Sequence, residues 1–294
     1  MTGLVTVLYK SDDVLEGFLK TLSIQTYKDY KLYLIDNSEN EGTDILLTNL
    51  LNRYPVSAYQ HIKTGGNIGV AAGNNAGIKA AMSDNCADVI LLNNDIESGQ
   101  DFVFEKILSV AATKQEAIIV PKILYYDTRK VWTAGGYMDN WRALGVHYDG
   151  YDENDQKSNI AKHITYAPTC FMYIKKEVFD HIGIMDEKYF AYYDDTDFVY
   201  RACQHGYKLY YEPSVTILHK VSSSSGGDNS LFYIYYSNRN KVYFIRKNYK
   251  GIRKLIALCY TLLSRTFFYL RFDKERRFRL LQGIKDGFKM PPGS

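Results

Sequence analysis

Short apolar runs alternate with amphipathic stretches along the first third of the chain. The run 4–9 (LVTVLY) predicts a strand, and the amphipathic stretch 13–24 after it predicts a helix. The pattern recurs, with strand-like stretches at 30–38, 56–62 and 88–95 and helical stretches at 43–52 and 76–82. Such alternation predicts an α/β fold with a mainly parallel central sheet and helices on both faces.

The pattern changes in the second half of the chain. Residues 121–213 are less regular and rich in Tyr, Gly and Asp, which we interpret as mixed strands and loops forming one side of a cleft. The run SSSSGG at 222–227 predicts a flexible loop or linker. Beyond it the chain becomes helical, basic and aromatic. We therefore predict a main domain of residues 1–228 and a basic, amphipathic helical extension of residues 229–294.

The net charge of +3 conceals a strong asymmetry. Residues 231–294 carry fifteen Lys and Arg against three Asp and Glu, so the preceding part is acidic. An acidic body with a basic tail predicts a site that holds a cation and a surface that faces anions. We expect no nucleic acid partner.

The four cysteines lie far apart, without a CxxC pair, which favours a reduced, cytoplasmic protein without a zinc site. The opening MTGLVTVLYKSDD lacks the basic and then apolar pattern of a signal peptide, and we interpret it as a first buried strand.

Polar side chains follow two of the predicted strands. Ligands of parallel sheets gather at the carboxyl ends of the strands, where Asp36 and the Asn93–Asp95 turn are expected. Asp36 would accept a hydrogen bond from a nucleobase or a ribose, or would merely cap the next element. Asn93 and Asp95 would offer oxygen ligands to Mg²⁺ or Mn²⁺ and, through the cation, bind a diphosphate. The alternative is an ordinary Asn-Asn-Asp turn.

A glycine-rich stretch, GGNIGVAAGNNAGI at 65–78, precedes one of the predicted helices. Glycines at a helix start let backbone N–H groups approach phosphate oxygens closely. The stretch does not fit the GxGxxG dinucleotide fingerprint. A tight structural turn is therefore an equally good interpretation of the glycines alone.

Three carboxylates fall within four positions, at Asp194, Asp195 and Asp197. They repel one another unless a cation, a proton or Arg201 compensates them, and Tyr and Phe flank them. We favour a functional cluster over a solvated run of charges. His219 also follows an apolar run, although a lone histidine is more often structural than functional.

Taken together, these segments resemble the family 2 glycosyltransferases of the GT-A fold, especially the bacterial rhamnosyltransferase-like branch. The resemblance covers nearly all of residues 4–250. The matching segments are IDNS, GNIGVAAGNNAGI, LLNND, CFMYIKKEVFDHIGIMDEKYFAYYDDTDFVYRACQHGYKLYYEP, ILHKVSSSSGG and YYSNRNKVYFIRKN.

The resemblance implies a role for each matching position. Asp36 would contact the nucleoside, and Asn67 with Gly69 would line the nucleotide pocket. Asp95 matches the last residue of the DxD motif, and His219 matches a late histidine that helps to hold the metal or the diphosphate.

The resemblance also implies the base, and the sequence departs from the family pattern at two positions. Asp195 matches the second residue of the family's Glu-Asp pair, the usual general base, and Asp194 stands where the family has Glu. Asn93 replaces the first carboxylate of DxD, which leaves strict dependence on Mg²⁺ or Mn²⁺ open.

The expected activity is inverting transfer of a sugar from dTDP-rhamnose or a UDP-hexose to a hydroxyl of a growing, lipid-linked cell-surface polysaccharide. The alternatives are a sugar-nucleotide nucleotidyltransferase and a noncatalytic carbohydrate-binding protein. Residues 229–294 would lie on an anionic membrane, at the inner face of the cell membrane, pack on the catalytic domain, or form a homodimer.

Overall fold

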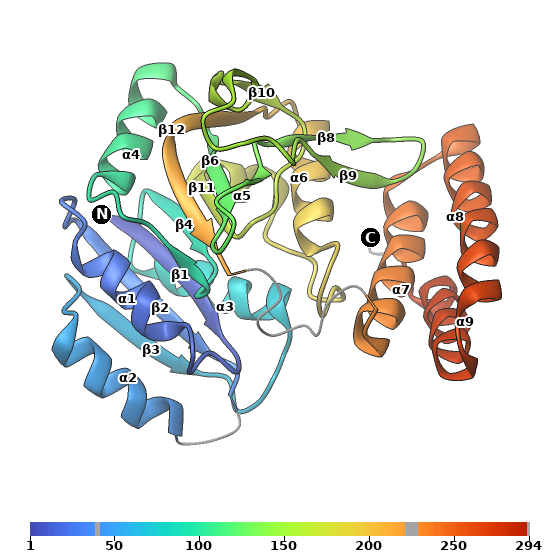
Figure 1. Ribbon diagram of the computed structural model, residues 1–294, viewed down its shortest axis with the longest axis horizontal. Coiled ribbons are helices and arrows are strands. Elements are labelled where there is room, and N and C mark those ends of the chain that lie inside the picture. Colours follow the sequence, from blue (N-terminus) through green and yellow to red (C-terminus); the bar gives the residue numbers. More distant parts are fainter. Residues whose placement is uncertain (39–41, 221–228, 293–294) are drawn as a thin grey trace.

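The computed structural model describes residues 1–38, 42–220 and 229–292, and the predicted linker at 222–227 lies outside these ranges (Figure 1). The strands are β1 (Thr2–Leu8), β2 (Tyr30–Asp36), β3 (Tyr59–Lys63), β4 (Asp88–Leu92), β5 (Ile96–Glu97), β6 (Ile118–Tyr125), β7 (Val131–Thr133), β8 (Gly136–Asp139), β9 (Leu144–His147), β10 (Lys162–Ile164), β11 (Phe171–Lys175) and β12 (Leu209–His219). The helices are α1 (Leu15–Ser23), α2 (Gly42–Arg53), α3 (Val70–Ser83), α4 (Val103–Lys114), α5 (Lys176–Ile182), α6 (Asp194–Gln204), α7 (Leu231–Asn248), α8 (Gly251–Arg271) and α9 (Lys274–Lys289), with a 3₁₀ turn at Gln156–Asn159.

The central sheet has the order β10-β12-β6-β11-β4-β1-β2-β3. The neighbours β4, β1, β2 and β3 pair in parallel, as do β12 and β6. Strand β11 lies between these two parallel groups and runs antiparallel to both β4 and β6. The mainly parallel sheet is therefore confirmed, and the irregular middle of the chain supplies antiparallel strands, among them β11 and β10.

Two hydrophobic cores lie on the two faces of this sheet. Leu4 and Val5 are neighbours in β1 and belong to different cores, because successive side chains of a strand point to opposite faces. Helices α1, α2 and α4 contribute to the core around Leu4, and helices α3, α5 and α6 contribute to the core around Val5. Helices therefore cover both faces, as predicted.

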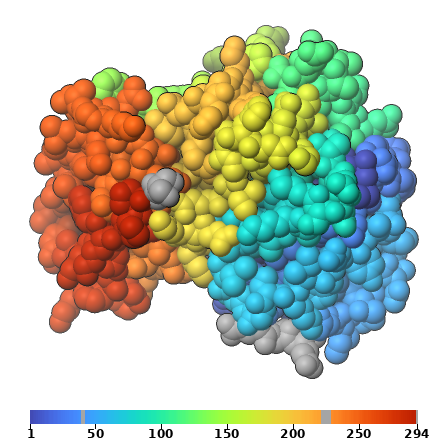
Figure 2. All heavy atoms as spheres, turned by 180° about the vertical axis from the view of Figure 1, so that it is seen from behind, coloured from blue at the N-terminus to red at the C-terminus, as the bar shows by residue number. Residues whose placement is uncertain are grey.

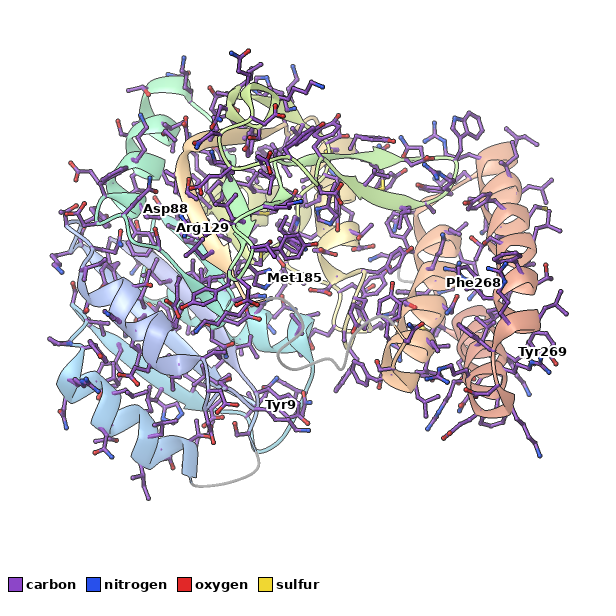
Figure 3. All side chains as sticks on the ribbon, in the orientation of Figure 1. Tyr9, Asp88, Arg129, Met185, Phe268 and Tyr269 are labelled. Atoms are coloured by element: carbon purple, nitrogen blue, oxygen red, sulfur yellow. The ribbon has the colours of Figure 1, made fainter. Side chains whose placement is uncertain are left out.

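The C-terminal helices form a lobe at one end of the molecule (Figures 1 and 2). Helix α9 packs closely on α7. A Cβ on Gly283 would lie 2.5 Å from the Tyr235 carbonyl oxygen, and a Cβ on Gly287 would lie 2.4 Å from the Arg239 carbonyl oxygen. Helix α8 lies outermost and carries Phe268 and Tyr269 (Figure 3). None of the helices in the described ranges is both long and apolar enough to cross a membrane.

Helix α7 is also bound to the body of the molecule. Asn240 donates hydrogen bonds to the carbonyls of Ala191 and Tyr192, at 2.7 and 2.9 Å, and Lys247 forms ion pairs with Asp186 and Asp197. The division of the chain at residue 228 stays a prediction. These contacts fix α7 against α6 and against the segment that precedes α6.

Candidate active site

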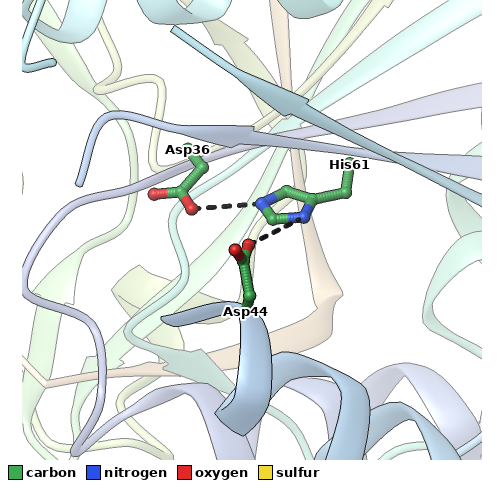
Figure 4. Close-up of side chains that lie close together, drawn as sticks. All are labelled: Asp36, Asp44 and His61. Atoms are coloured by element: carbon green, nitrogen blue, oxygen red, sulfur yellow. Dashed lines mark hydrogen bonds and ion pairs between the residues drawn. The ribbon is translucent and has the colours of Figure 1, made fainter. Parts of the chain in front are cut away.

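Asp36 is buried at the carboxyl end of β2. Its Oδ1 accepts a hydrogen bond from the Ser38 amide at 2.8 Å, and its Oδ2 lies 3.1 Å from His61 Nε2. The other ring nitrogen of His61 lies 3.5 Å from Asp44 (Figure 4), and Asp44 also pairs with Lys63. Asp36 Oδ1 thus stabilises the turn after β2, and His61 holds Asp36 Oδ2 in place.

Sequence reasoning missed His61 and Asp44. Parallel pairing aligns Leu34 of β2 with His61 of β3, which brings the imidazole beside the end of β2. The ligand atoms of Asp36, Asp44 and His61 lie within 4.8 Å of one another, close enough to share a cation. The signal in the sequence was a histidine two residues from the end of the neighbouring strand.

The glycine-rich loop connects β3 with α3 and is fixed on both sides. Asn67 Oδ1 accepts a hydrogen bond from the Gly69 amide at 3.0 Å, and the Asn37 side chain donates to the Gly69 carbonyl at 3.1 Å. Gly69 has a φ of 88°, and a Cβ there would lie 2.5 Å from the Phe190 carbonyl oxygen. Glycine is required here because the loop touches the segment that leads into α6.

The Asn93–Asp95 segment is a turn that connects β4 with β5. Asn93 is exposed, whereas Asp95 is buried. Asn94 donates to the Val7 carbonyl at 3.0 Å and to Ser11 Oγ at 2.6 Å, and thereby ties the end of β4 to the end of β1.

His219 lies beside Asp95, at the end of β12. Its Nε2 is 3.2 Å from Asp95 Oδ1, and the Lys220 amide donates to the Asp95 carbonyl oxygen at 2.9 Å. The Nδ1 atom of His219 is buried and has no hydrogen-bond partner among the described residues. The structure thus brings together two of the residues that were predicted to hold a metal.

Asp194 and Asp195 begin α6, after two tyrosines in the left-handed backbone region. Asp195 Oδ2 accepts a hydrogen bond from the Tyr166 hydroxyl at 3.2 Å, and its Oδ1 accepts from the Thr196 amide at 2.6 Å and from the Thr196 hydroxyl at 3.1 Å. Burial raises the pKa of both aspartates, and their mutual repulsion raises that of Asp194 further. These hydrogen-bond donors to Asp195 are neutral, and none is a cation.

Asp197, on the same helix, has a different environment. It is fully buried, and its carboxylate pairs with Arg201 at 2.8 Å and Lys247 at 2.9 Å. It also accepts hydrogen bonds from the Tyr189 hydroxyl and the Asn248 amide. The predicted Asp197–Arg201 ion pair is confirmed, and Asp197 joins α6 to α7.

Asp95 and Asp195 border a common region of the molecule. Burial raises the pKa of the Cys170 thiol, and the charges of both aspartates raise it further, so both lie near this one side chain. A row of rings also connects the two carboxylates. The ring centroids are 4.5 Å apart for His219 and Trp132, 5.3 Å for Trp132 and His147, and 5.3 Å for His147 and Tyr166, whose hydroxyl reaches Asp195.

A cavity of about 730 Å³ lies next to the segments that carry Asp95 and His219. Its walls include Glu97, two residues after Asp95, and Leu218, one residue before His219. None of the predicted site residues lines it, so the cavity is a separate feature of the molecule.

Comparison with known proteins identifies the class of protein that this fold and these carboxylates define. The family model "Glycosyl transferase family 2" matches residues 4–183. The chain therefore belongs to glycosyltransferase family 2, and it is a glycosyltransferase rather than a nucleotidyltransferase or a noncatalytic protein.

Several curated relatives match most of the chain. The low-salt glycan biosynthesis hexosyltransferase Agl10 of Haloferax volcanii is 24% identical over 89% of this chain and 80% of its own length. The N-acetylglucosaminyl-diphospho-decaprenol L-rhamnosyltransferase of Mycobacterium tuberculosis is 23% identical over 95% of this chain and 97% of its own length. The dTDP-rhamnosyl transferase RfbF of Shigella flexneri is 22% identical over 63% of this chain and 62% of its own length.

Solved structures confirm the fold. The mannosyltransferase PcManGT of Pyrobaculum calidifontis, in complex with GDP-Man and Mn²⁺, has a TM-score of 0.60 and 12% identity over 98% of this chain and 86% of that one. TarS of S. aureus has a TM-score of 0.64 and 12% identity over 98% of this chain and 48% of that one. The predicted GT-A architecture is therefore correct.

Proposed function

We propose that this glycosyltransferase transfers a sugar, with inversion, from dTDP-rhamnose or a UDP-hexose to a hydroxyl of a lipid-linked saccharide that is extended into a cell-surface polysaccharide. The names of the relatives that transfer rhamnose and hexose support the donor, and the diphospho-decaprenol acceptor of the mycobacterial relative supports the lipid. The single observation that carries the proposal is that a continuous row of ring contacts joins Asp95 to Asp195, although the two carboxylates come from distant segments.

Asp195 is the proposed general base. Tyr166 and Thr196 hold its two oxygens in place, and burial keeps its pKa above that of an ordinary aspartate, nearer to a useful pH for proton abstraction. The acceptor oxygen forms a bond to the anomeric carbon while the bond from that carbon to the phosphate oxygen breaks. The hydroxyl proton passes to Asp195, and the nucleoside diphosphate leaves.

Asp95 and His219 are the residues proposed to hold a divalent cation. A carboxylate oxygen and an imidazole nitrogen are suitable ligands for Mn²⁺, and the buried Nδ1 of His219 has no partner in the described ranges. Bound Mg²⁺ or Mn²⁺ would neutralise the charge of the departing diphosphate. The Asp36, Asp44 and His61 group is less suitable because Lys63 already pairs with Asp44, and we assign Asp36, with Asn67 and Gly69, to the nucleotide.

The exposed face of α8 is proposed to rest on an anionic membrane, at its cytoplasmic side. Leu255, Leu263 and Leu270 are each more than half exposed, and basic residues of α8 and α9 accompany them. We expect the full chain to sediment with phosphatidylglycerol vesicles and Leu263→Glu to weaken this binding. Ile45→Glu, at an equally exposed position on α2, is the control. Equal vesicle binding by both variants would refute membrane binding through α8. A stable dimer in solution would then indicate that a second copy of the chain covers this face.

A panel of nucleotide sugars tests the donor. We expect one dTDP- or UDP-sugar to raise the melting temperature, more strongly with Mn²⁺ than with EDTA, and to release nucleoside diphosphate slowly by hydrolysis. Asp95→Asn should reduce the rise in melting temperature that the donor causes in Mn²⁺. The rise that the donor causes in EDTA should stay unchanged. If Asp95→Asn keeps the full Mn²⁺ effect, the cation binds elsewhere. A panel without any response rules out these donors.

A further inference from the structure

The β8–β9 hairpin extends towards the C-terminal helices (Figure 1), and the hairpin and two of these helices carry three basic residues. Arg142 lies in the hairpin turn, Lys241 on α7 and Arg265 on α8. Lys241 is only 4% exposed, and its ammonium lies 5.7 Å from the centre of the Tyr260 ring. Arg142 and Tyr260 are both partly exposed, so the cluster is open to solvent on one side.

The positive charges of this cluster exceed its negative charges. Asp139 binds Arg142 at 2.6 Å, but the partner of Arg265, at 2.5 Å, is the neutral amide oxygen of Asn238. Within the described ranges, no carboxylate lies at salt-bridge distance from Lys241. Burial, followed by the charges of Arg265 and Arg142, lowers the pKa of Lys241 to about 7, and Asp139 opposes this effect only in part.

The cluster lies close to the proposed base. Tyr193 directly precedes the acid pair, and its hydroxyl donates to the carbonyl of Ala143, next to Arg142, at 3.1 Å. Burial raises the pKa of Tyr193, the charge of Arg265 opposes this rise, and the charge of Asp195 adds to it. The Tyr193–Ala143 hydrogen bond thus joins the segment that carries Asp195 to the hairpin turn that carries Arg142, so an acceptor that reaches Asp195 can place a second, anionic group at this cluster.

We propose that Arg142, Lys241 and Arg265 bind the diphosphate that joins the acceptor saccharide to its lipid, an inference that rests on the function proposed above. Ammonium and guanidinium groups form strong, charge-assisted hydrogen bonds to phosphate oxygens. The exposed apolar residues of α8, with Leu263 and Phe267 one to two turns beyond Tyr260, then provide a surface for the lipid chain.

This role distinguishes Lys241 from a residue that stabilises the fold. A buried, unpaired ammonium is costly, and a nonpolar side chain of similar length removes this cost. Lys241→Met is therefore expected to fold and to melt at the same or a higher temperature. Lys250→Met removes the same charge from an exposed position two residues after the end of α7 and is the matched control.

The test measures binding of dodecyl diphosphate to the full chain by titration calorimetry in EDTA, which removes the cation from the donor side. We expect Lys241→Met, and the second variant Arg265→Gln, to bind at least tenfold more weakly than the wild type, with Lys250→Met unchanged. Phosphatidylglycerol vesicles should bind all four proteins equally. A loss of vesicle binding alone in Lys241→Met would identify the anion as a phospholipid headgroup and overturn the proposal.

Release of nucleoside diphosphate from the donor, measured on the same preparations, separates the two proposals. Unchanged release in Lys241→Met together with weak dodecyl diphosphate binding supports the diphosphate site. Normal dodecyl diphosphate binding by Lys241→Met, or an equal loss in Lys250→Met, refutes the site and leaves the proposed function intact. A wild-type protein that neither hydrolyses nor transfers any donor refutes the proposed function itself.

Discussion

Helix α7 buries two lysines six residues apart in opposite surroundings. Lys247 lies between Asp186 and Asp197, at 2.8 and 2.9 Å. Burial alone would raise the pKa of Asp186, but hydrogen bonds from Lys247 and from the Lys188 amide outweigh it and hold this pKa low. Lys241, one and a half turns earlier, has two arginines and a single carboxylate, Asp139, as its charged neighbours, and the arginines outweigh the carboxylate. One lysine is neutralised by the fold, and the other is left for a ligand.

Helix α6 repeats this contrast with the opposite sign of charge. Asp197 is neutralised by Arg201 and Lys247, whereas Asp194, which is buried, and Asp195, which is half-buried, lie beside each other with raised pKa values. Removing one partner of a compensated buried pair destabilises a structure, whereas removing an uncompensated buried charge does not, and uncompensated charges are therefore candidates for function. The comparison predicts opposite effects of mutation at the two kinds of position.

The largest effect is expected for Asp195→Asn. The amide cannot accept the acceptor proton, so transfer should fall by roughly 10²–10⁴ while donor binding is retained. Single-turnover transfer and donor thermal shift, measured side by side, test this. Because the isosteric amide also removes a buried charge, its melting temperature should not fall. Transfer at the wild-type rate would place the base elsewhere, with Asp194→Asn as the next variant to examine.

Asp197→Ala should instead destabilise the protein, by about 3–5 kcal/mol, because Arg201 and Lys247 lose a buried counter-charge. Urea denaturation measures this change. The double variant Asp197→Ala/Arg201→Met should recover part of the loss, since Asp197 is the only carboxylate that pairs with Arg201 among the described residues. A loss of transfer without a loss of stability would contradict the structural role and place Asp197 in the catalytic machinery.

The pH profile of transfer gives the next prediction. The pKa of Asp195 is raised, so the ionised base is lost as the pH falls through a range above that of an ordinary aspartate. We therefore expect the rate to rise with pH on its acidic limb, at a higher pH than an unperturbed carboxylate would give. A limb near pH 4 would show that Asp195 is not the titrating base.

The smallest expected effect concerns stability at alkaline pH. The folded state keeps Lys241 at a pKa of about 7, below its unfolded value, so the folded state binds fewer protons than the unfolded state above that pH. The free energy of unfolding should therefore rise with pH from about 7 towards the unfolded pKa of lysine. Lys241→Met should lack this rise, and melting curves of both proteins between pH 6.5 and about 9 compare them.

Much of the fold was predictable because it depends on local pattern. Short apolar runs at 4–9 and 30–38 predict β1 and β2, and helical stretches between the strands predict the crossovers, so the parallel part of the sheet follows. Strand β11 was not predicted, because its apolar residues, at 171–175, do not reveal that it runs antiparallel between β4 and β6.

The candidate site was predictable only in part. Asp36, Asp95 and Asp195 were found because each follows an apolar run or interrupts an aromatic one. His61, His147 and Trp132 were missed, since each is unremarkable in sequence and gains its neighbours only through strand pairing or ring contacts.

The sequence by itself determined which residue types are available: acids at strand ends, glycines before α3, and basic and apolar residues in the C-terminal part. Only the tertiary structure decided which charges are neutralised. Asp195 and Asp197 lie two positions apart on α6, and Lys241 and Lys247 lie six positions apart on α7. The surroundings within each pair differ because of contacts between elements far apart in the chain, such as Tyr166 with Asp195 and Lys247 with Asp186 and Asp197. The physical reason is that an electrostatic environment depends on distance in space and on burial, and separation along the sequence specifies neither.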